Sequence, residues 1–461
     1  MIVARYLSLA VPLLAVLAAA RVDRSRAGVD RSRAGRAGAL LAFLAAGIGI
    51  AALDELARHA GWYTFTPVRG NYRGMPVDLW IGWAVLWGPL PVLLRRSLPL
   101  PVALGLLLWV DAVAMPALHP LVRLGPDWLV GELVGLLVVA LPAQLLGRWC
   151  ADRRHLAART LLQVGLFTAL LLWFVPSLAF EVGDGSWATA AELPRPVLLL
   201  LAQVALVLAA PALAAVREFV THGGGTPYPW DPPVRLVTTG PYAYLANPMQ
   251  TCAVALVLLT AALTRSSALV LAAVVAVAFS VAVARPHEEH DLADRHGGVW
   301  RAYRRQVRDW WPRRRPYHVG PAAVLFLDDT CGPCAATWRF VARRRPVGLL
   351  LRPAAEADGV LWRAAYTDGG GRSERGVAAV ARALGHLHLG WAVVGWVLRL
   401  PGVGWLAQLV TDAMIAPPHP AGPRGGRCPA PSSDSWTAPS PPSARTASPV
   451  CPPAPSPRPP G

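Results

Sequence analysis

The sequence contains no lysine, although it carries a formal net charge of +17. All of its positive charge therefore comes from arginine. Because the whole chain shows this bias, genome composition explains it better than a nucleic-acid-binding patch does. The arginines also cluster beside apolar segments, where basic residues set membrane topology. We therefore expect no nucleic-acid partner.

Charged residues of either sign are scarce. Only 15% of the residues are charged, whereas 54% are hydrophobic and the mean hydropathy is +0.40. An ordinary soluble domain is less apolar than this, and 461 residues leave room for more than one unit. The composition predicts an integral membrane protein with several parts.

Cysteine is too rare for a disulfide framework, since six cysteines are spread over the whole chain. Only Cys331 and Cys334 form a motif. The other four are expected to be small buried residues in apolar segments or to lie in a polar tail: Cys150, Cys252, Cys428 and Cys451.

Long apolar stretches predict a mainly α, polytopic helical membrane protein. A membrane span needs about 20 mostly apolar residues, and this rule gives about nine spans. They cover residues 3–20, 39–57, 79–94, 98–118, 128–147, 159–178, 196–216, 250–264 and 267–284. Arginine-rich loops alternate with loops that have little positive charge. The positive-inside rule therefore places the N-terminus outside and the chain after Arg285 in the cytoplasm, in what we expect to be a bacterial cell membrane.

Asp111 and Glu132 stand in otherwise apolar segments. An ionisable group at membrane depth is costly and is a candidate functional site by default. A position near a helix end, or a hydrogen-bonded packing role, would explain the same residues without a function. The sequence leaves both interpretations open.

The order of parts between residues 223 and 316 is the most informative pattern. A polar loop rich in proline and glycine leads into the last two apolar segments, which only Arg265, Ser266 and Ser267 separate. The carboxylates Glu288 and Glu289 follow. Because an apolar hairpin returns the chain to the side that it left, the loop and the carboxylates must face the same aqueous compartment and can form one pocket.

The motifs of this stretch resemble those of the isoprenylcysteine carboxyl methyltransferase and phospholipid methyltransferase family. LVTTGPYAYLANPM is similar to the family's LV-x-x-G-x-Y and R-[HN]-P elements, and EEHDL, with Trp300 and Tyr303 downstream, is similar to its second signature. The resemblance covers roughly residues 217–316. It implies a membrane enzyme that transfers a methyl group from S-adenosylmethionine to a lipid-like or prenyl-like acceptor.

The resemblance also implies which residues bind. Arg285 corresponds to a family arginine that pairs with the acceptor's carboxylate. The residues implied to contact the cofactor are Val234, Arg235, Leu236, Val237, Tyr242, Asn247, Pro248, Met249, Glu288 and Glu289. The chain departs from the family at Ala246, which replaces an arginine, and at Gln250, which replaces a tyrosine. Loss of that arginine removes a bidentate anion donor, so another group would have to hold the donor's carboxylate.

Two other interpretations of the acidic stretch need no methyltransferase. The carboxylates could form the solvated face of a helix, paired with Arg295, Arg301 and Arg304. Alternatively, the stretch supplies metal-ligand residue types: His287, Glu288, His290, Asp291 and His296. No second ligand cluster completes such a site, so we expect no metal.

A different pattern begins after Pro321. The short apolar run AVLFLDD is followed by TCGPC and then by a segment with helical periodicity. A strand that leads into C-x-x-C at a helix start is typical of thioredoxin-like redox sites, because the helix N-terminus stabilises the thiolate of Cys331 while Cys334 resolves a mixed disulfide. A zinc half-site is the alternative, but a second cysteine pair at a suitable distance is missing.

Residues 322–416 as a whole resemble the DCC family of thiol-disulfide oxidoreductases. The resemblance lies in D-x-x-C-x-x-C from Asp328 to Cys334, in YTDGGGRSERGVAAVARAL, and in the Leu-Pro element at Leu400 and Pro401. It implies catalytic roles for Cys331 and Cys334 and a thiol redox partner. The family's usual glycine is replaced by Asp329. After Pro417 the chain is rich in proline and serine and cannot bury a core, so we expect disorder there.

These patterns predict four parts: an N-terminal helical membrane region (1–195), a membrane methyltransferase-like domain (196–318), a thioredoxin-like α/β domain (319–418) and a disordered tail (419–461). The expected function is a membrane methyltransferase with a fused cytoplasmic redox domain. Two alternatives remain. In one, the CGPC motif of a membrane-anchored oxidoreductase does the work and the methyltransferase-like region is degenerate. In the other, the protein is a scaffold and no enzyme.

Overall fold

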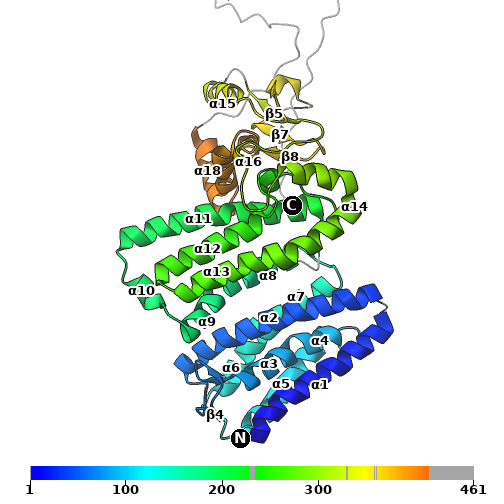
Figure 1. Cartoon of the computed structure of the whole chain (residues 1–461), viewed down its shortest axis with the longest axis vertical. Coiled ribbons are helices and arrows are strands. Elements are labelled where there is room, and N and C mark those ends of the chain that lie inside the picture. Colours follow the sequence, from blue (N-terminus) through cyan, green and yellow to red (C-terminus); the bar gives the residue numbers. More distant parts are fainter. Residues whose placement is uncertain are drawn as a thin grey trace, which may run out of the picture. The chain divides into compact units, whose positions relative to one another are not determined.

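The computed structural model describes residues 2–27, 29–228, 234–328, 331–357, 359 and 361–414. The chain is mainly helical, with a few short sheets (Figure 1). The predicted tail at 419–461 lies outside the described residues.

Residues 2–182 form a helical bundle with two small β-ribbons. Strand β1 (Tyr63–Phe65) pairs with β4 (Val122–Leu124), and β2 (Asn71–Tyr72) pairs with β3 (Met75–Pro76), both antiparallel. The helices are α1 (Ile2–Ala27), α2 (Val29–Ala60), α3 (Val77–Trp87), α4 (Pro89–Leu93), α5 (Leu100–Ala117), α6 (Trp128–Gly135), α7 (Leu141–Ala151), α8 (Leu156–Ala169) and α9 (Val175–Val182).

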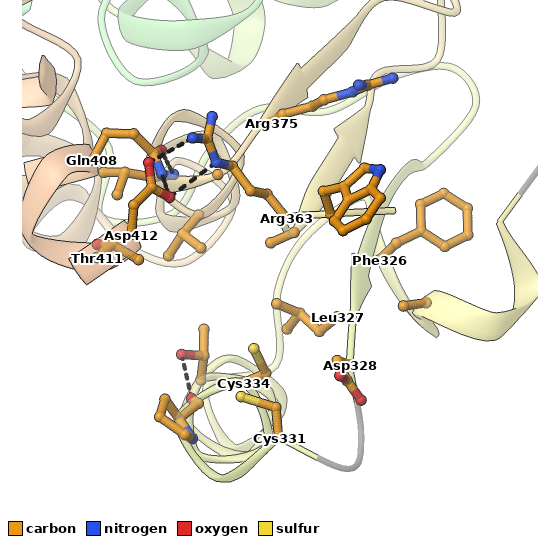
Figure 2. Close-up of a pocket in the computed structure, with 18 residues that line it drawn as sticks. Phe326, Leu327, Asp328, Cys331, Cys334, Arg363, Arg375, Gln408, Thr411 and Asp412 are labelled. Carbon is orange, nitrogen blue, oxygen red and sulfur yellow. Dashed lines mark hydrogen bonds and ion pairs between the residues drawn. The ribbon is translucent and has the colours of Figure 1, made fainter. Parts of the chain in front are cut away.

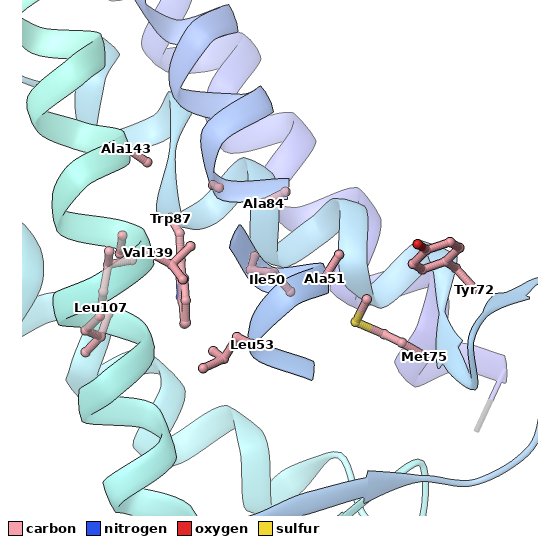
Figure 3. Close-up of a cluster of buried hydrophobic side chains, with 13 residues drawn as sticks. Ile50, Ala51, Leu53, Tyr72, Met75, Ala84, Trp87, Leu107, Val139 and Ala143 are labelled. Atoms are coloured by element: carbon pink, nitrogen blue, oxygen red, sulfur yellow. The ribbon is translucent and has the colours of Figure 1, made fainter. Parts of the chain in front are cut away.

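The largest buried apolar cluster surrounds Trp87 and draws side chains from α2, α3, α5 and α7 (Figure 3). Asp111 is fully buried beside it and accepts a 2.9 Å hydrogen bond from the indole N–H of Trp87. Glu132 is also buried. Both carboxyl groups therefore lie inside the bundle and not at exposed helix ends.

Three π-helical segments keep helices continuous across prolines. They are η1 (Leu136–Ala140) between α6 and α7, η2 (Leu170–Phe174) between α8 and α9, and η5 (Ser280–Ala284). Each ends two residues before a proline: Pro142, Pro176 and Pro286. The residue before each proline donates its N–H to the carbonyl five residues back. The wider turn avoids the clash between a proline ring and the carbonyl four residues back, so the chain continues without a break.

Within the described part of the chain, six helices are long and apolar enough to cross a membrane: Ile2–Ser25, Ser32–Ala60, Leu100–Ala117, Trp128–Ala151, Leu156–Val182 and Arg195–Gly223. Three shorter apolar helices occupy the other predicted spans: Val77–Leu93, Pro248–Thr264 and Ser267–Ala282. All nine predicted segments are therefore apolar helices, and six of them have the length of a span.

Residues 195–306 contain the predicted loop and hairpin. Helix α11 (Arg195–Glu218) continues through η3 (Phe219–Gly223) to the loop, whose short 3₁₀ turn η4 (Gly240–Ala243) precedes α12 (Pro248–Thr264) and α13 (Ser267–Phe279). Asp184 holds the tight connection between α12 and α13, since it accepts the backbone N–H groups of Ser267 and Ala268 at 2.7 and 3.2 Å. The π-segment η5 then leads directly into α14 (Arg285–Gln306).

A small α/β unit follows. Its four-stranded sheet has the order β6-β5-β7-β8, with β5 and β6 parallel and the other pairs antiparallel. The strands are β5 (Ala323–Leu327), β6 (Leu349–Pro353), β7 (Ala365–Thr367) and β8 (Ser373–Arg375), and the helices are α15 (Gly332–Arg343), α16 (Val377–Leu384), α17 (Leu389–Leu398) and α18 (Pro401–Met414). Apolar side chains of β5, α15 and α16 form its core.

Candidate functional site

The loop at residues 234–249 is held at its start by Glu218, near the end of α11. The Thr239 hydroxyl donates a 2.7 Å hydrogen bond to the Glu218 carboxylate. Gly240 has a positive φ of +60°, and a Cβ atom there would lie 2.6 Å from Cγ of Glu218. The glycine of the LVTTGPY motif is therefore required by both its backbone conformation and its close approach to Glu218.

Glu218 is fully buried and is the centre of an ion-pair network. Its carboxylate lies 2.6 Å from Arg382 and 3.6 Å from Arg399, both in the α/β unit, and 3.0 Å from His222. His222 in turn lies 3.2 Å from Asp368. A buried carboxylate needs charged and hydrogen-bonding partners. Two of the four partners of Glu218, Arg382 and Arg399, come from the α/β unit.

Tyr242 links the middle of the loop to α14. Its ring is buried and lies 5.0 Å from the ring of Phe219. Its carbonyl accepts a 2.8 Å hydrogen bond from the hydroxyl of Tyr303, which belongs to α14 and is itself buried. The loop before the hairpin and the helix after it are therefore in direct contact.

A chain of polar contacts joins the end of the loop to the predicted carboxylates. The Asn247 amide donates to Asp309 at 3.0 Å, and the guanidinium of Arg304 donates to Asp309 at 2.6 Å and to Glu289 at 3.4 Å. Arg285 donates to Glu289 at 2.9 Å. Asn247 and Glu289 thus lie within one polar cluster, which we call the Glu289 cluster: Asn247, Arg285, Glu289, Arg304 and Asp309.

Glu289 remains accessible within this cluster. Its side chain is 41% exposed, and hydrogen bonds from Arg285 and Arg304 lower its pKa. It is therefore an ionised carboxylate that can still accept a hydrogen bond from a ligand. The pairing with Arg304 is also the contact that the charged-face interpretation of this helix predicts.

The neighbouring acidic residues are only partly described. The side chains of His287, Glu288 and Asp291 lie outside the described residues. Among the side chains that are described, no group of three or more His, Cys, Asp or Glu residues could hold a metal ion.

Three other loop residues implied to bind the cofactor line a cavity outside the Glu289 cluster. Arg235, Leu236 and Val237 line a cavity of about 450 Å³ that Asp368 and Arg372 of the α/β unit also line. The remaining residues of the predicted set divide between surface and interior. Val234 is 77% exposed, Pro248 starts α12, and Met249 packs against the buried Tyr242 and Val237. The predicted set is therefore divided among the Glu289 cluster, this cavity, the surface and the interior.

The two departures from the family motif have structural partners. Ala246 is buried against Tyr303 and Tyr317, and its N–H donates to the carbonyl of Arg308 at 2.9 Å. The amide oxygen of Gln250 accepts a 2.6 Å hydrogen bond from Ser280 across the hairpin. Arg304 is the guanidinium that lies beside Asn247 and Glu289. In the sequence, Arg304 is marked only as part of the alternative charged face, and neither Asp309 nor Glu218 is marked as a site residue.

Cys331 and Cys334 line a separate cavity of about 590 Å³ (Figure 2). Cys331 immediately precedes α15, and Cys334 lies in its first turn. Burial and the hydrogen bond with Cys331 raise the pKa of Cys334 from 9.0 to about 12. Across the cavity, Arg363 pairs with Asp412 of α18. Asp329 lies outside the described residues.

Comparison with known proteins locates a family match in the loop and hairpin region. No curated protein and no solved structure matches the chain. Residues 196–296 match the model of a family described as phospholipid methyltransferase. The matched range runs from α11 into α14 and includes the loop, the hairpin and Glu289. Over these residues the chain is similar to phospholipid methyltransferases, which indicates a membrane methyltransferase.

Proposed function

We propose that residues 196–318 form an S-adenosylmethionine-dependent methyltransferase that acts on a lipid-like or prenyl-like acceptor. The main support for this proposal is the direct contact between the loop and α14. Tyr303 bonds to the carbonyl of Tyr242, and Asn247 reaches Glu289 through Asp309 and Arg304. The family match over 196–296 supports the same reaction class.

The residues of the cluster fit the chemistry of the donor. Methyl transfer moves CH₃ from the sulfonium sulfur to a nucleophilic atom of the acceptor and leaves S-adenosylhomocysteine, so its main requirement is alignment of the two reactants. The exposed carboxylate of Glu289 can accept hydrogen bonds from the ribose or ammonium groups of the donor. Arg304, held by Asp309, can donate to the donor's carboxylate in place of the arginine that Ala246 replaces. Arg285 would pair with an anionic group of the acceptor.

The proposed topology follows from the arginine distribution. The N-terminus lies outside, and the loop, α14 and the α/β unit lie on the cytoplasmic side. An apolar acceptor would then reach the site from within the bilayer, beside α12 and α13.

Donor binding tests this function. Calorimetric titration of the detergent-solubilised chain with S-adenosylmethionine should show binding, and Glu289→Ala should weaken it by about 1.5 kcal/mol or more, which is roughly tenfold in Kd. Glu356→Ala is a matched control. Glu356 is 39% exposed and pairs at 3.0 Å with Arg352, four residues earlier, as Glu289 pairs at 2.9 Å with Arg285. Equal affinity of wild type and Glu289→Ala would remove Glu289 from the site.

We propose a second activity for the α/β unit at residues 319–418, that of a thiol-disulfide oxidoreductase. The supporting observation is topological. A parallel β5-α15-β6 unit followed by two antiparallel strands and a helix is the arrangement of a thioredoxin-like domain, and Cys331 lies where α15 begins. The Cys331 thiolate would attack a partner disulfide, and the Cys334 thiolate would then displace the partner. The partner gains two electrons as two thiols, and the protein forms the Cys331–Cys334 disulfide.

Two variants separate this activity from methyl transfer. Cys331→Ser should abolish reduction of a model disulfide and leave methyl transfer unchanged, and Cys334→Ser should trap a mixed disulfide. Cys252→Ser, at a buried position in α12, is the control. Suppose that the wild-type chain does not bind the donor but reduces disulfides, and that Cys331→Ser abolishes this reduction. The membrane region is then an anchor. If neither activity exists, the protein is a scaffold.

A further inference from the structure

The last two described helices form a bent apolar pair that neither activity uses. Helices α17 and α18 follow one another at an angle of 87°, and together, though not singly, they are long and apolar enough to cross a membrane. From the sequence, this stretch is expected to belong to a cytoplasmic domain. An apolar pair of this length is unusual for a domain that meets only water.

Helix α17 packs directly on a membrane span. Ala392 and Trp396 of α17 share a buried cluster with Ala210 and Ala214 of α11. Helix α11 belongs to the candidate span Arg195–Gly223. Ala214 and Ala210 lie four and eight residues before the buried Glu218, or about 6 and 12 Å along the helix axis. This contact therefore places α17 beside the cytoplasmic part of a span.

Helix α18 has two different faces. Gln408 accepts a 2.8 Å hydrogen bond from the N–H of Val377, and Asp412 accepts one from Arg363 at 3.0 Å, so these residues attach α18 to the α/β unit. The other face carries a contiguous row of exposed apolar side chains, which we call the α18 stripe: Trp405 (68% exposed), Leu406 (58%), Leu409 (46%), Val410 (49%) and Met414 (80%).

We propose that the α18 stripe lies in the cytoplasmic interface of the lipid bilayer. An exposed apolar row of this length on a soluble surface marks an interaction site, and an amphipathic helix with tryptophan and leucine on one face is suited to the membrane interface. The stripe is continuous with α17, which already packs on a span. The residues after Met414 are rich in proline, serine and arginine and offer few apolar side chains to cover it.

This placement has a consequence for the thiols. Gln408, Thr411 and Asp412 of α18 line the same cavity as Cys331 and Cys334 (Figure 2). Because these residues lie on the face of α18 opposite the stripe, the cysteine cavity would open on the side of α18 that faces away from the bilayer.

Hydroxyl-radical footprinting of the full chain tests the proposal without a substitution. Trp405 and Trp362 belong to the same unit and are 68% and 63% exposed. In nanodiscs that hold one chain each, Trp405 and Met414 should be oxidised several-fold more slowly than Trp362, because lipid excludes the radical. Equal oxidation of Trp405 and Trp362 would overturn the proposal.

A second arm distinguishes lipid from protein as the cover. A chain that ends at Met414, in the same nanodiscs, should keep the protection of Trp405. If the protection disappears, the C-terminal segment covers the stripe and the proposal is wrong. If protection in the full chain appears only in nanodiscs that hold two chains, the occupant is a second copy, which also overturns it. Neither arm depends on methyl transfer, so the proposed function can fail independently.

Discussion

Two carboxylate clusters hold opposite ends of the loop at residues 234–249, and they differ in burial. Glu218 is fully buried and contacts Thr239, His222, Arg382 and Arg399. Glu289 also contacts two arginines, yet its side chain is 41% exposed. Charge alone therefore does not identify a binding group. The buried carboxylate is committed to holding the loop and the α/β unit, whereas the exposed one can still meet a ligand.

The strongest test of this comparison is Glu218→Ala. The substitution removes the buried carboxylate that Arg382 and Arg399 share, although both keep Glu374 at 3.4 and 2.8 Å. Breaking a buried pair costs about 3–5 kcal/mol when it leaves a charge unpaired, so the loss should approach the lower end of that range. We expect a large loss of thermal stability in detergent. Glu218→Gln, which keeps the volume and the hydrogen bond from Thr239, should lose less. Glu289→Ala should leave stability nearly unchanged, since exposed pairs contribute about 0–1 kcal/mol. Equal losses for Glu218→Ala and Glu289→Ala would refute the distinction.

Asp309→Ala tests whether a buried residue of the Glu289 cluster positions the donor site. Asp309 is buried and accepts hydrogen bonds from Arg304 and Asn247 at 2.6 and 3.0 Å. Its loss removes the shortest hydrogen bond of Arg304 and the bond that holds Asn247. Donor binding should therefore weaken by about 1.5–3 kcal/mol, the range for hydrogen bonds to charged groups. Titration calorimetry measures the effect. Unchanged affinity would mean that Asp309 does not position the donor site.

Gly240→Ala tests whether the buried cluster shapes the loop. Gly240 and Gly224 both have positive φ angles, +60° and +69°, but only Gly240 lies against Glu218. Alanine at Gly224 meets nothing within 4 Å and reports backbone strain alone, about 1–2 kcal/mol. Gly240→Ala should cost more than Gly224→Ala in thermal unfolding and should also weaken donor binding. Equal effects would show that contact with Glu218 does not matter.

Cys331 and Cys334 test, with a smaller expected effect, whether burial decides which of two like groups can react. The pKa of Cys334 is raised from 9.0 to about 12 by burial and by the bond with Cys331. Iodoacetamide at pH 9 should therefore modify Cys331 well before Cys334, as peptide mass spectrometry can measure. Because the folded state holds the proton more tightly, Cys334 contributes stability below pH 9 that is lost as the pH rises towards about 12. Faster modification of Cys334 would contradict this assignment.

Local order along the chain predicted much of this arrangement. The loop, the tight hairpin and the acidic helix follow one another as the sequence indicates, and a hairpin must bring its two flanks to one side. This is why a contact between the loop and the segment after the hairpin could be anticipated, although the pair that makes it, Tyr242 and Tyr303, was not predicted. The positions of the apolar helices were likewise readable from composition, because a span depends on a continuous apolar run.

Contacts between distant residues could not be read in this way. Glu218 pairs with Arg382, which lies 164 residues later, and Asn247 bonds to Asp309, 62 residues away. Neither pair belongs to a periodic pattern or a motif, so nothing local marks Glu218 or Asp309 as special. The packing of α17 on α11 could not be predicted for the same reason. The apolar face of a helix predicts that the face is buried, but it does not predict which element buries it.

Whether the loop and α14 form one donor site can be measured by photo-cross-linking labelled S-adenosylmethionine to the full chain and mapping the labelled peptides. The account predicts label in peptides from residues 234–249 and 285–309, and loss of both in Asp309→Ala. Label confined to the N-terminal bundle or to the α/β unit would contradict the claim that the loop and α14 form one donor site.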